Sequence, residues 1–373
     1  MRAIELFAGA GGLGIGVSRA GFRPSLIIER DRWCCETLRE NRHVIDNDWP
    51  SPTEGDIRAV DFRPHAGVDI VTGGPPCQPF SLGGKHRAHA DHRDMWSEAV
   101  RAVRETRPRA FIFENVRGLA RQSFGAYLGY ILLQLQHPSL PNREGEEWAD
   151  HLARLQRKHT GKGAAEYRVV HQVLDAADYG VAQRRHRVVI VGFQTDVDAG
   201  WCFPAPSHSA GALARTQSDG SYWDRHEVPR RERIAMRAPS CVSDAMPWLT
   251  VRDALTDLPD PRSGDAASWT NHRFQDGARS YPGHTGSPID EPAKALKAGV
   301  HGVPGGENMM RLADGSIRYF TVREAARLQA FPDNWRFHGS WSAAMRQLGN
   351  AVPTTLGEIV ATSVRRHLEA EAL

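Results

Sequence analysis

The sequence has few cysteines and no long apolar run. Its 373 residues include five cysteines, and these form no C-x-x-C pair of the kind that marks a zinc site or a disulfide scaffold. No apolar stretch approaches the roughly 20 residues that a membrane-spanning helix needs. Near the N-terminus, Glu5 interrupts the first apolar residues, so this end lacks the apolar core of a signal peptide. We therefore expect a cytoplasmic protein with no metal and no membrane segment.

The sequence also lacks a strong excess of one charge. Its net charge of +3 permits an anionic partner but does not by itself indicate one. No internal repeat or low-complexity tract is present, and the length is ample for a buried core and more than one domain. The composition is ordinary for a soluble globular protein.

Short apolar runs alternate with helix-like stretches in the first half of the chain. The predicted strands are residues 3–7, 25–29, 68–74, 110–116, 166–174 and 186–193. Helical patterns follow the second and third of these strands. This alternation predicts an α/β fold with a mostly parallel sheet and helices on both faces.

Two stretches interrupt the alternation. Residues 137–166 are charged and contain a predicted helix at 145–158, so we interpret them as a solvated insertion. Beyond Gly192 the pattern dissolves until about Arg318, which is too long for a loop and predicts a second domain.

We therefore divide the chain into three parts. The first domain is residues 1–193 with the insertion at about 137–166. The second, smaller domain is residues 194–344, with its core at about 194–317. Residues 345–373 form a C-terminal helix that returns to the first domain. The core of the second domain is expected to contain Trp201, Trp223, Trp248 and Trp269.

A glycine-rich turn follows the first predicted strand. Gly9, Gly11 and Gly14 fit the pattern G-x-G-x-x-G. Glu29 follows Gly9 at about the twenty-residue distance where that fingerprint places a ribose-binding acid. The glycines indicate a backbone that passes close to a ligand at the start of a helix. NAD and other adenosine cofactors satisfy both signals, so the turn alone leaves an NAD-dependent oxidoreductase open.

The sharpest feature is the stretch GGPPCQPFS, residues 73–81. It follows a predicted strand, at the sheet edge where open α/β sheets bind their ligands. Pro75 and Pro76 fix the approach to Cys77, and the rigid rings leave little backbone freedom there. Pro79 stiffens the exit. A lone cysteine is by default a small buried apolar residue, but these surroundings favour a nucleophile.

Two polar clusters follow later predicted strands. Glu114 ends an apolar strand, where apolar neighbours would raise its carboxyl pKa and let it hold or donate a proton. A helix N-cap is the alternative. Gln183, Arg185 and Arg187 alternate into another strand, so their side chains face one side. This cationic row suits an anionic or carbonyl-bearing substrate, and a solvated edge strand is the alternative.

Several motifs occur in an order that resembles one enzyme family. They are FAGAGGLG, GGPPCQPFS, ENV, QRRHR, TVREAARLQAFPDNW and QLGNAVP. This ordered set is similar to the motifs of the DNA (cytosine-5)-methyltransferases of the bacterial type II kind. The resemblance covers the N-terminal half except residues 137–166, and the chain from Thr321 onward. It implies a Rossmann-like catalytic domain at 1–193 and an irregular target-recognition domain at 194–344.

The resemblance also assigns a role to each matching residue. S-adenosylmethionine, whose product is S-adenosylhomocysteine, would be held by Phe7, Gly9, Gly11, Gly12, Glu29, Asp56, Ile57, Pro76, Trp96, Asn350 and Val352. Cys77 would be the nucleophile, and Glu114 would bind N3 and the amino edge of cytosine. Arg185 and Arg187 would orient the base and the catalytic loop, with support from Gln183. The loop that closes on DNA would include Ser81, Gly83, Lys85, Arg87 and Arg93.

The chain departs from the family pattern at three positions. Ala182 stands where proline is frequent. Trp96 stands where an aliphatic residue often lies beside the cofactor. Arg30 stands where a bulky apolar residue often stacks on adenine.

The resemblance implies methylation of carbon 5 of a flipped-out cytosine in a short double-stranded DNA site. We expect a monomer that contacts the nucleoid through DNA and serves restriction–modification or phage defence. An RNA (tRNA) cytosine-5 methyltransferase would carry the same catalytic motifs and stays open as an alternative. An NAD-dependent oxidoreductase would leave Cys77 and Glu114 unexplained, and the intact PPCQ and ENV motifs argue against an inactive binding protein.

Overall fold

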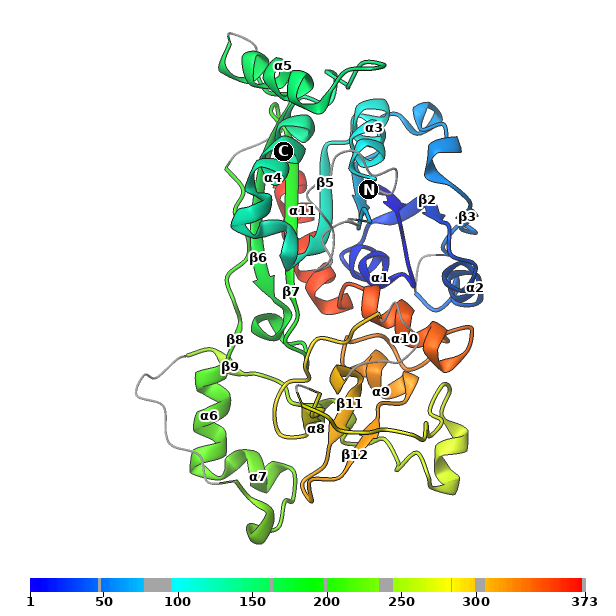
Figure 1. The fold of residues 1–373 in the computed structure, drawn as a ribbon, viewed down its shortest axis with the longest axis vertical. Coiled ribbons are helices and arrows are strands. Elements are labelled where there is room, and N and C mark those ends of the chain that lie inside the picture. The colour runs from blue at the N-terminus through cyan, green and yellow to red at the C-terminus, as the bar shows by residue number, and fades with distance from the viewer. Residues whose placement is uncertain are drawn as a thin grey trace.

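The structure, a computed structural model, describes residues 1–45, 48–76, 95–161, 164–197, 200–234, 244–282, 284–298 and 306–370. In these residues the chain forms a seven-stranded sheet of order β3-β2-β1-β4-β5-β7-β6, with helices on both faces (Figure 1). The strands are β1 (Arg2–Leu6), β2 (Arg23–Glu29), β3 (Thr53–Glu54), β4 (Ile70–Gly73), β5 (Ala110–Val116), β6 (Tyr167–Asp175) and β7 (His186–Gln194). The predicted strands are therefore confirmed.

The large sheet is parallel except at β7. Strands β1 to β5 pair in parallel, whereas β7 runs antiparallel to both β5 and β6. Residues 176–185 join β6 to β7 directly, because antiparallel neighbours need no crossover helix. The mostly parallel α/β class predicted from the sequence is confirmed.

Helices cover both faces of this sheet. Helices α3 and α4 pack on one face, and α1 and α11 pack on the other. The helices are α1 (Gly12–Arg19), α2 (Arg32–Glu40), α3 (Trp96–Thr106), α4 (Gly125–Gln136), α5 (Trp148–Thr160), α6 (Ala210–Asp219), α7 (Ser221–Arg225), α8 (Val251–Leu255), α9 (Val322–Arg327), α10 (Trp341–Asn350) and α11 (Thr354–Ala370). Helix α5 lies in the charged insertion, close to the predicted range of 145–158.

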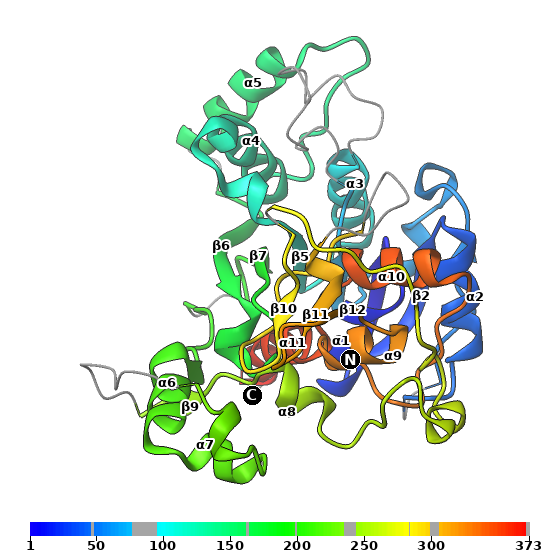
Figure 2. The same ribbon diagram turned by 60° about the horizontal axis from the view of Figure 1, so that its bottom comes forward.

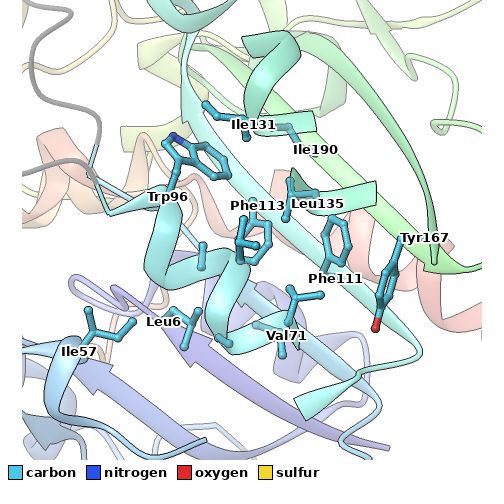
Figure 3. Packing of buried hydrophobic residues seen from close by; sticks show 14 of the residues in the cluster. Leu6, Ile57, Val71, Trp96, Phe111, Phe113, Ile131, Leu135, Tyr167 and Ile190 are labelled. Atoms are coloured by element: carbon cyan, nitrogen blue, oxygen red, sulfur yellow. The ribbon is translucent and has the colours of Figure 1, made fainter. Parts of the chain in front are cut away.

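Side chains of β5 alternate between the two faces. Phe111 and Phe113 lie in the core formed with α3 and α4, as Figure 3 shows. Ala110 and Ile112 lie in the core formed with α1 and α11. This alternation follows from the period of two along a strand, and burial of both faces is typical of parallel sheets. A polar side chain on β5 therefore has access to a ligand only at the end of the strand.

A third core joins the sheet to the second half of the chain. Ile15 of α1 and Leu38 of α2 belong to the same apolar cluster as Phe320, Leu328 and Leu348. Helices α9 and α10 accordingly lie beside α1 and α2 (Figure 2). The remaining short strands are β8 (His208–Ser209), β9 (Met246–Pro247), β10 (Ser287–Pro288), β11 (Met309–Arg311) and β12 (Ile317–Tyr319).

Trp201 does not lie in the core of the second domain, and this prediction was wrong. Its indole packs on Phe193 of β7, with 5.7 Å between ring centroids, and its Nε1 donates to Ser363 Oγ of α11 at 3.0 Å. The large ring fills apolar space between β7 and α11, so the chain stays on the sheet beyond residue 193. Trp223 and Trp248 do pack in a separate small cluster, as predicted.

The described residues show neither a membrane span nor a metal cluster. Within them no helix is long and apolar enough to cross a membrane. No group of three or more His, Cys, Asp or Glu side chains in the same residues is placed to hold a metal ion.

Candidate active site

A cavity of about 1030 Å³ opens at the carboxyl ends of β1, β2, β4 and β5. This is the sheet edge at which open α/β folds bind ligands, and the volume suits a cofactor-sized molecule. Many of the residues predicted to form a site line this cavity: Phe7, Gly9, Gly12, Glu29, Asp56, Ile57, Pro76, Glu114, Arg187, Asn350 and Val352.

The turn between β1 and α1 lets the backbone approach other groups closely. Gly11, the N-cap of α1, has φ 86°, a left-handed conformation that glycine adopts without strain. A Cβ at Gly12 would lie 2.3 Å from the Val352 carbonyl oxygen. Phe7 has φ 54°, and non-glycine residues in this strained region are frequent at binding sites. The turn is therefore built for close packing beside the cavity.

The Glu29 carboxylate fixes this turn from the end of β2. Its Oε2 accepts a hydrogen bond from the backbone N–H of Gly9 at 2.7 Å. Its Oε1 accepts from the backbone N–H groups of Arg30 and Asp31, each at 2.7 Å. Hydrogen bonds to an ionised carboxylate are stronger than those between neutral groups. Glu29 therefore fixes the glycine turn relative to the residues that follow β2.

Asp56 lies at another side of the cavity, before the short turn that begins at Ile57. Its carboxylate accepts hydrogen bonds from the backbone and the side chain of Arg58. The Arg58 guanidinium holds the pKa of the Asp56 carboxyl well below its usual range. This wall thus places an ionised carboxylate, paired with a guanidinium, beside the buried apolar side chain of Ile57.

Glu114 and Arg187 form a buried ion pair at the end of β5. Each residue is 8% exposed, and Arg187 Nε contacts Glu114 Oε1. Arg187 lies opposite Val116 in the β5–β7 register, two residues beyond Glu114, so the two side chains meet diagonally. Burial raises the pKa of the Glu114 carboxyl, and the Arg187 guanidinium opposes that rise. A carboxyl in this setting can hold or deliver a proton.

Comparison with known proteins decides the family. A family model described as C-5 cytosine-specific DNA methylase matches residues 1–138 and 156–366. The chain belongs to the C-5 cytosine-specific DNA methylases. The enzyme class predicted from the motifs, a DNA (cytosine-5)-methyltransferase, is thereby confirmed.

Relatives of this methylase along almost the whole chain are named type II methyltransferases. M.PspPI of Psychrobacter sp. (strain TA137) is 33% identical over 375 residues, which cover 98% of this chain and 79% of that protein. M.NgoMIV of Neisseria gonorrhoeae is 30% identical over 373 residues, which cover 99% of this chain and 98% of that protein.

Solved structures share the fold of this methylase. A putative DNA modification methyltransferase encoded within an E. coli prophage has a TM-score of 0.61 at 19% identity, covering 99% of each chain. The S. pombe Dnmt2 methyltransferase has a TM-score of 0.59 at 16% identity, also covering 99% of each chain.

Two predicted cofactor contacts do not line the cavity of the methylase. Trp96 begins α3 and is 1% exposed. Its indole packs edge-on against Phe113, and Met95 lines the cavity instead. Gly11 instead faces the side chains of Leu38, Trp49 and Trp335. Trp96 faces the apolar core because the first turn of α3 turns this side chain toward the sheet.

The predicted polar row of Gln183, Arg185 and Arg187, at the start of β7 and just before it, is also divided between two environments. Arg187 reaches the cavity, whereas Gln183 and Arg185 are fully buried. The guanidinium of Arg185 donates to the main-chain carbonyls of Leu296, Gly349 and Ala351. The structure therefore places Arg185 against the backbone beside the cavity and not in its wall.

Cys77 and the predicted DNA-contacting residues lie outside the described residues. The predicted DNA-contacting residues are Ser81, Gly83, Lys85, Arg87 and Arg93. The segment that leads to Cys77 is described as far as Pro76, which lines the cavity. Asn115 Nδ2 donates to the Pro75 carbonyl at 2.9 Å. This bond anchors the approach to Cys77 beside Glu114, a role that sequence reasoning did not assign to Asn115.

Glu5 is a further residue that sequence reasoning missed. It lies in β1, is 3% exposed and lines the cavity. Its Oε1 accepts from the backbone N–H of Gly14 at 2.9 Å, and no described residue donates to its Oε2. Burial raises the pKa of this carboxyl to about 8. The available signal was an acid inside an apolar strand just before the glycine turn.

Glu5 also explains one glycine of the fingerprint. A Cβ at Gly14 would lie 1.9 Å from Glu5 Oε2. The third glycine thus makes room for a carboxyl group of the protein, where helix α1 crosses close to β1.

Stability of the Glu5→Gln variant should depend less on pH than stability of the wild type. Below pH of about 4.5, the pKa of this carboxyl in the unfolded state, the group is neutral in both the folded and the unfolded state. Its ionisation then does not lower the free energy of unfolding. As pH rises toward about 8, the unfolded state ionises first, so the folded state loses relative stability. Glutamine is neutral at every pH and keeps an oxygen for Gly14.

Melting temperatures measured in steps from acid to mildly alkaline pH check this prediction. The two proteins should melt at similar temperatures in acid, and the wild type should fall below the variant as pH rises. Parallel curves throughout would contradict the assigned ionisation of Glu5.

Proposed function

We propose that this methylase transfers a methyl group from S-adenosylmethionine to carbon 5 of cytosine within a short, specific site of double-stranded DNA. One observation carries the proposal. The Glu114–Arg187 pair and the glycine turn held by Glu29 line the same cavity. The ion pair suits a polar base edge, and the turn with its carboxylate suits the ribose of an adenosine.

The cavity fits S-adenosylmethionine on its own chemistry. Glu29 would accept hydrogen bonds from the ribose hydroxyls, and Ile57 would contact the adenine. The Glu5 carboxyl, which lines the cavity and whose Oε2 has no donor among the described residues, would accept a hydrogen bond from the cofactor. Asn350 and Val352 lie at the same wall as the glycine turn. When bound, S-adenosylmethionine supplies a methyl group carried on a positively charged sulfur.

Cys77 would activate the cytosine ring by covalent attack. Its thiolate forms a bond to carbon 6, and the electron pair displaced from the ring double bond makes carbon 5 nucleophilic. After carbon 5 gains a methyl group, a base removes the proton from that carbon. The carbon 6–sulfur bond then breaks, which restores the double bond and releases the Cys77 thiolate.

Glu114 would stabilise the charge that this attack places on the ring. Negative charge develops at N3, and a proton or hydrogen bond from Glu114 neutralises it. The raised pKa of the Glu114 carboxyl favours the protonated form that this step needs. Arg187 would keep the carboxyl oriented through the contact of its Nε with Oε1.

The target base must leave the helix, because thiolate attack on carbon 6 and methyl transfer to carbon 5 approach the faces of the ring, which stacked neighbours cover. Flipping costs roughly a few kcal/mol in lost stacking and pairing. We propose that residues 194–344 recognise the DNA site, and that residues 345–373 complete the catalytic domain. The enzyme would act as a monomer on cytoplasmic DNA. A role in a restriction–modification or defence system is supported by its relatives, which are named type II methyltransferases.

Transfer of label from S-adenosylmethionine tests the function directly. Incubation with mixed-sequence duplex DNA should label the DNA, and bisulfite sequencing should locate 5-methylcytosine in one short sequence. Transfer RNA under the same conditions should stay unlabelled. Label on transfer RNA and none on DNA would favour the RNA alternative, and label on neither would contradict the proposal.

A further inference from the structure

The backbone of Arg185, the residue just before β7, is fixed by two hydrogen bonds. Its N–H donates to Asp175 Oδ1 at 2.9 Å, and its carbonyl accepts from Ala176 N–H at 3.0 Å. These bonds tie Arg185 to the end of β6. The side chain is 1% exposed, so the direction of its guanidinium is set by the surrounding protein.

The guanidinium joins two segments that are far apart in the sequence. Nη1 donates to the Leu296 carbonyl at 2.9 Å. Nη2 donates to the carbonyls of Gly349 and Ala351 at 2.6 and 2.9 Å. We call residues 349–352 the cofactor loop, since all four line the cavity. The planar fork of an arginine directs separate N–H groups at both segments in a fixed geometry, whereas a lysine ammonium offers a single nitrogen.

The partner segment, residues 293–298, is held firmly from other sides. The Ala293 N–H donates to the Ala182 carbonyl at 2.9 Å, and the Arg184 N–H donates to the Ala293 carbonyl at 2.8 Å. The Asn308 side chain, 1% exposed, donates to and accepts from the backbone of Lys297, both at 3.1 Å. The segment is therefore tied to the β7 entry and to the second domain.

The cofactor loop also touches this segment directly. A Cβ at Gly349 would lie 2.3 Å from the Ala298 backbone nitrogen. The two backbones are thus in van der Waals contact, and a shift of one must displace the other or break the Arg185 bonds. Among the described residues, every oxygen that accepts a hydrogen bond from the Arg185 guanidinium is neutral.

We propose that Arg185 is a positioning residue that couples the cofactor loop to residues 293–298 of the second domain. Binding of S-adenosylmethionine to the loop then stabilises this segment further through the guanidinium. By linkage, DNA held by the second domain strengthens cofactor binding to the same degree. The inference rests on the proposed cofactor and adds a route between the two ligands.

Hydrogen exchange measured by mass spectrometry tests this coupling without any methyl transfer. In the wild type, saturating S-adenosylmethionine should slow amide exchange in peptides that contain residues 349–352 and in peptides that contain residues 293–298. In Arg185→Lys the first protection should remain at saturation and the second should become clearly smaller, because only the direct contact between Gly349 and Ala298 is left to transmit it. The dissociation constant for S-adenosylmethionine should rise about tenfold, since hydrogen bonds that position the loop are lost.

Arg323→Lys is a matched control. Arg323 is also fully buried and donates to three main-chain carbonyls, those of Thr270, Pro332 and Trp335. None of these three carbonyls belongs to the cofactor loop. This variant should lose thermal stability but keep both protected regions and the wild-type dissociation constant, measured well below its melting temperature.

The outcomes separate this inference from the proposed function. If Arg185→Lys keeps the wild-type protection at residues 293–298, or if Arg323→Lys loses it equally, the positioning role of Arg185 is overturned. If the wild type binds no S-adenosylmethionine, the proposed cofactor itself is wrong and the coupling falls with it.

Discussion

Transfer of labelled methyl groups to DNA is expected to fall by roughly 10⁴-fold or more when Cys77 is replaced by alanine. In the proposed mechanism no bond to carbon 6 can form without the thiolate, and carbon 5 of the ring then stays too weak a nucleophile to accept a methyl group. The variant should keep the wild-type melting temperature and the wild-type affinity for S-adenosylmethionine, because neither depends on the thiol.

Cys202→Ala is the control for this experiment. Cys202 is a free and exposed cysteine, and its loss should leave methylation unchanged. A second measurement uses DNA with fluorine at carbon 5 of the target cytosine. Elimination needs a proton on that carbon, so the wild type should remain covalently attached and Cys77→Ala should not. Methylation by Cys77→Ala above one tenth of the wild-type rate would exclude the nucleophilic role.

Glu114→Gln is expected to lower kcat by about 10²- to 10⁴-fold, the usual contribution of a general acid. Glutamine keeps the size of the side chain but cannot give a proton to N3 of cytosine. It also leaves the guanidinium of Arg187 without its ionic partner in a buried setting, so a moderate loss of stability should accompany the loss of rate.

The pH profile distinguishes proton transfer from a purely structural effect of Glu114. Burial raises the pKa of this carboxyl, so the protonated form persists to higher pH than in an exposed glutamate and is lost as pH rises through that pKa. The wild-type rate should therefore decline on the alkaline side, and this decline should be absent from the residual activity of Glu114→Gln.

Glu98→Gln provides the matched control for this experiment. Glu98 pairs with Arg101 on α3 at 2.7 Å and does not line the cavity. Its replacement should leave both kcat and the pH profile unchanged. An alkaline decline that survives in Glu114→Gln would assign the titration to another group.

The sequence predicted those parts of the site that depend on local pattern. Apolar runs located the strands, and the rule that ligands bind at the carboxyl ends of parallel strands brought Glu29 and Glu114 to one edge. Alternation placed Arg185 and Arg187 on one side of a strand. The same pattern could not separate their roles, because Arg185 is bound by carbonyls more than a hundred residues away in the sequence.

Other features escaped prediction for the same physical reason. Trp96 begins a helix whose rotation is set by packing against Phe113, which no local pattern reveals. Trp201 follows the last strand but packs on α11, whose position depends on the whole fold. Glu5 was visible as an acid in an apolar strand, yet its burial only became apparent once α1 was placed over it.

The contact between Glu5 and Gly14 constrains how this chain can change over evolution. Any side chain at Gly14 would enter space that the Glu5 carboxyl already occupies, so the glycine is replaceable only after the acid becomes smaller. Loss of the acid first would free position 14 and open a different set of substitutions. The order of the two mutations thus decides whether replacement of Gly14 is tolerated, and relatives with a larger residue at position 14 are expected to have a residue smaller than glutamate at position 5.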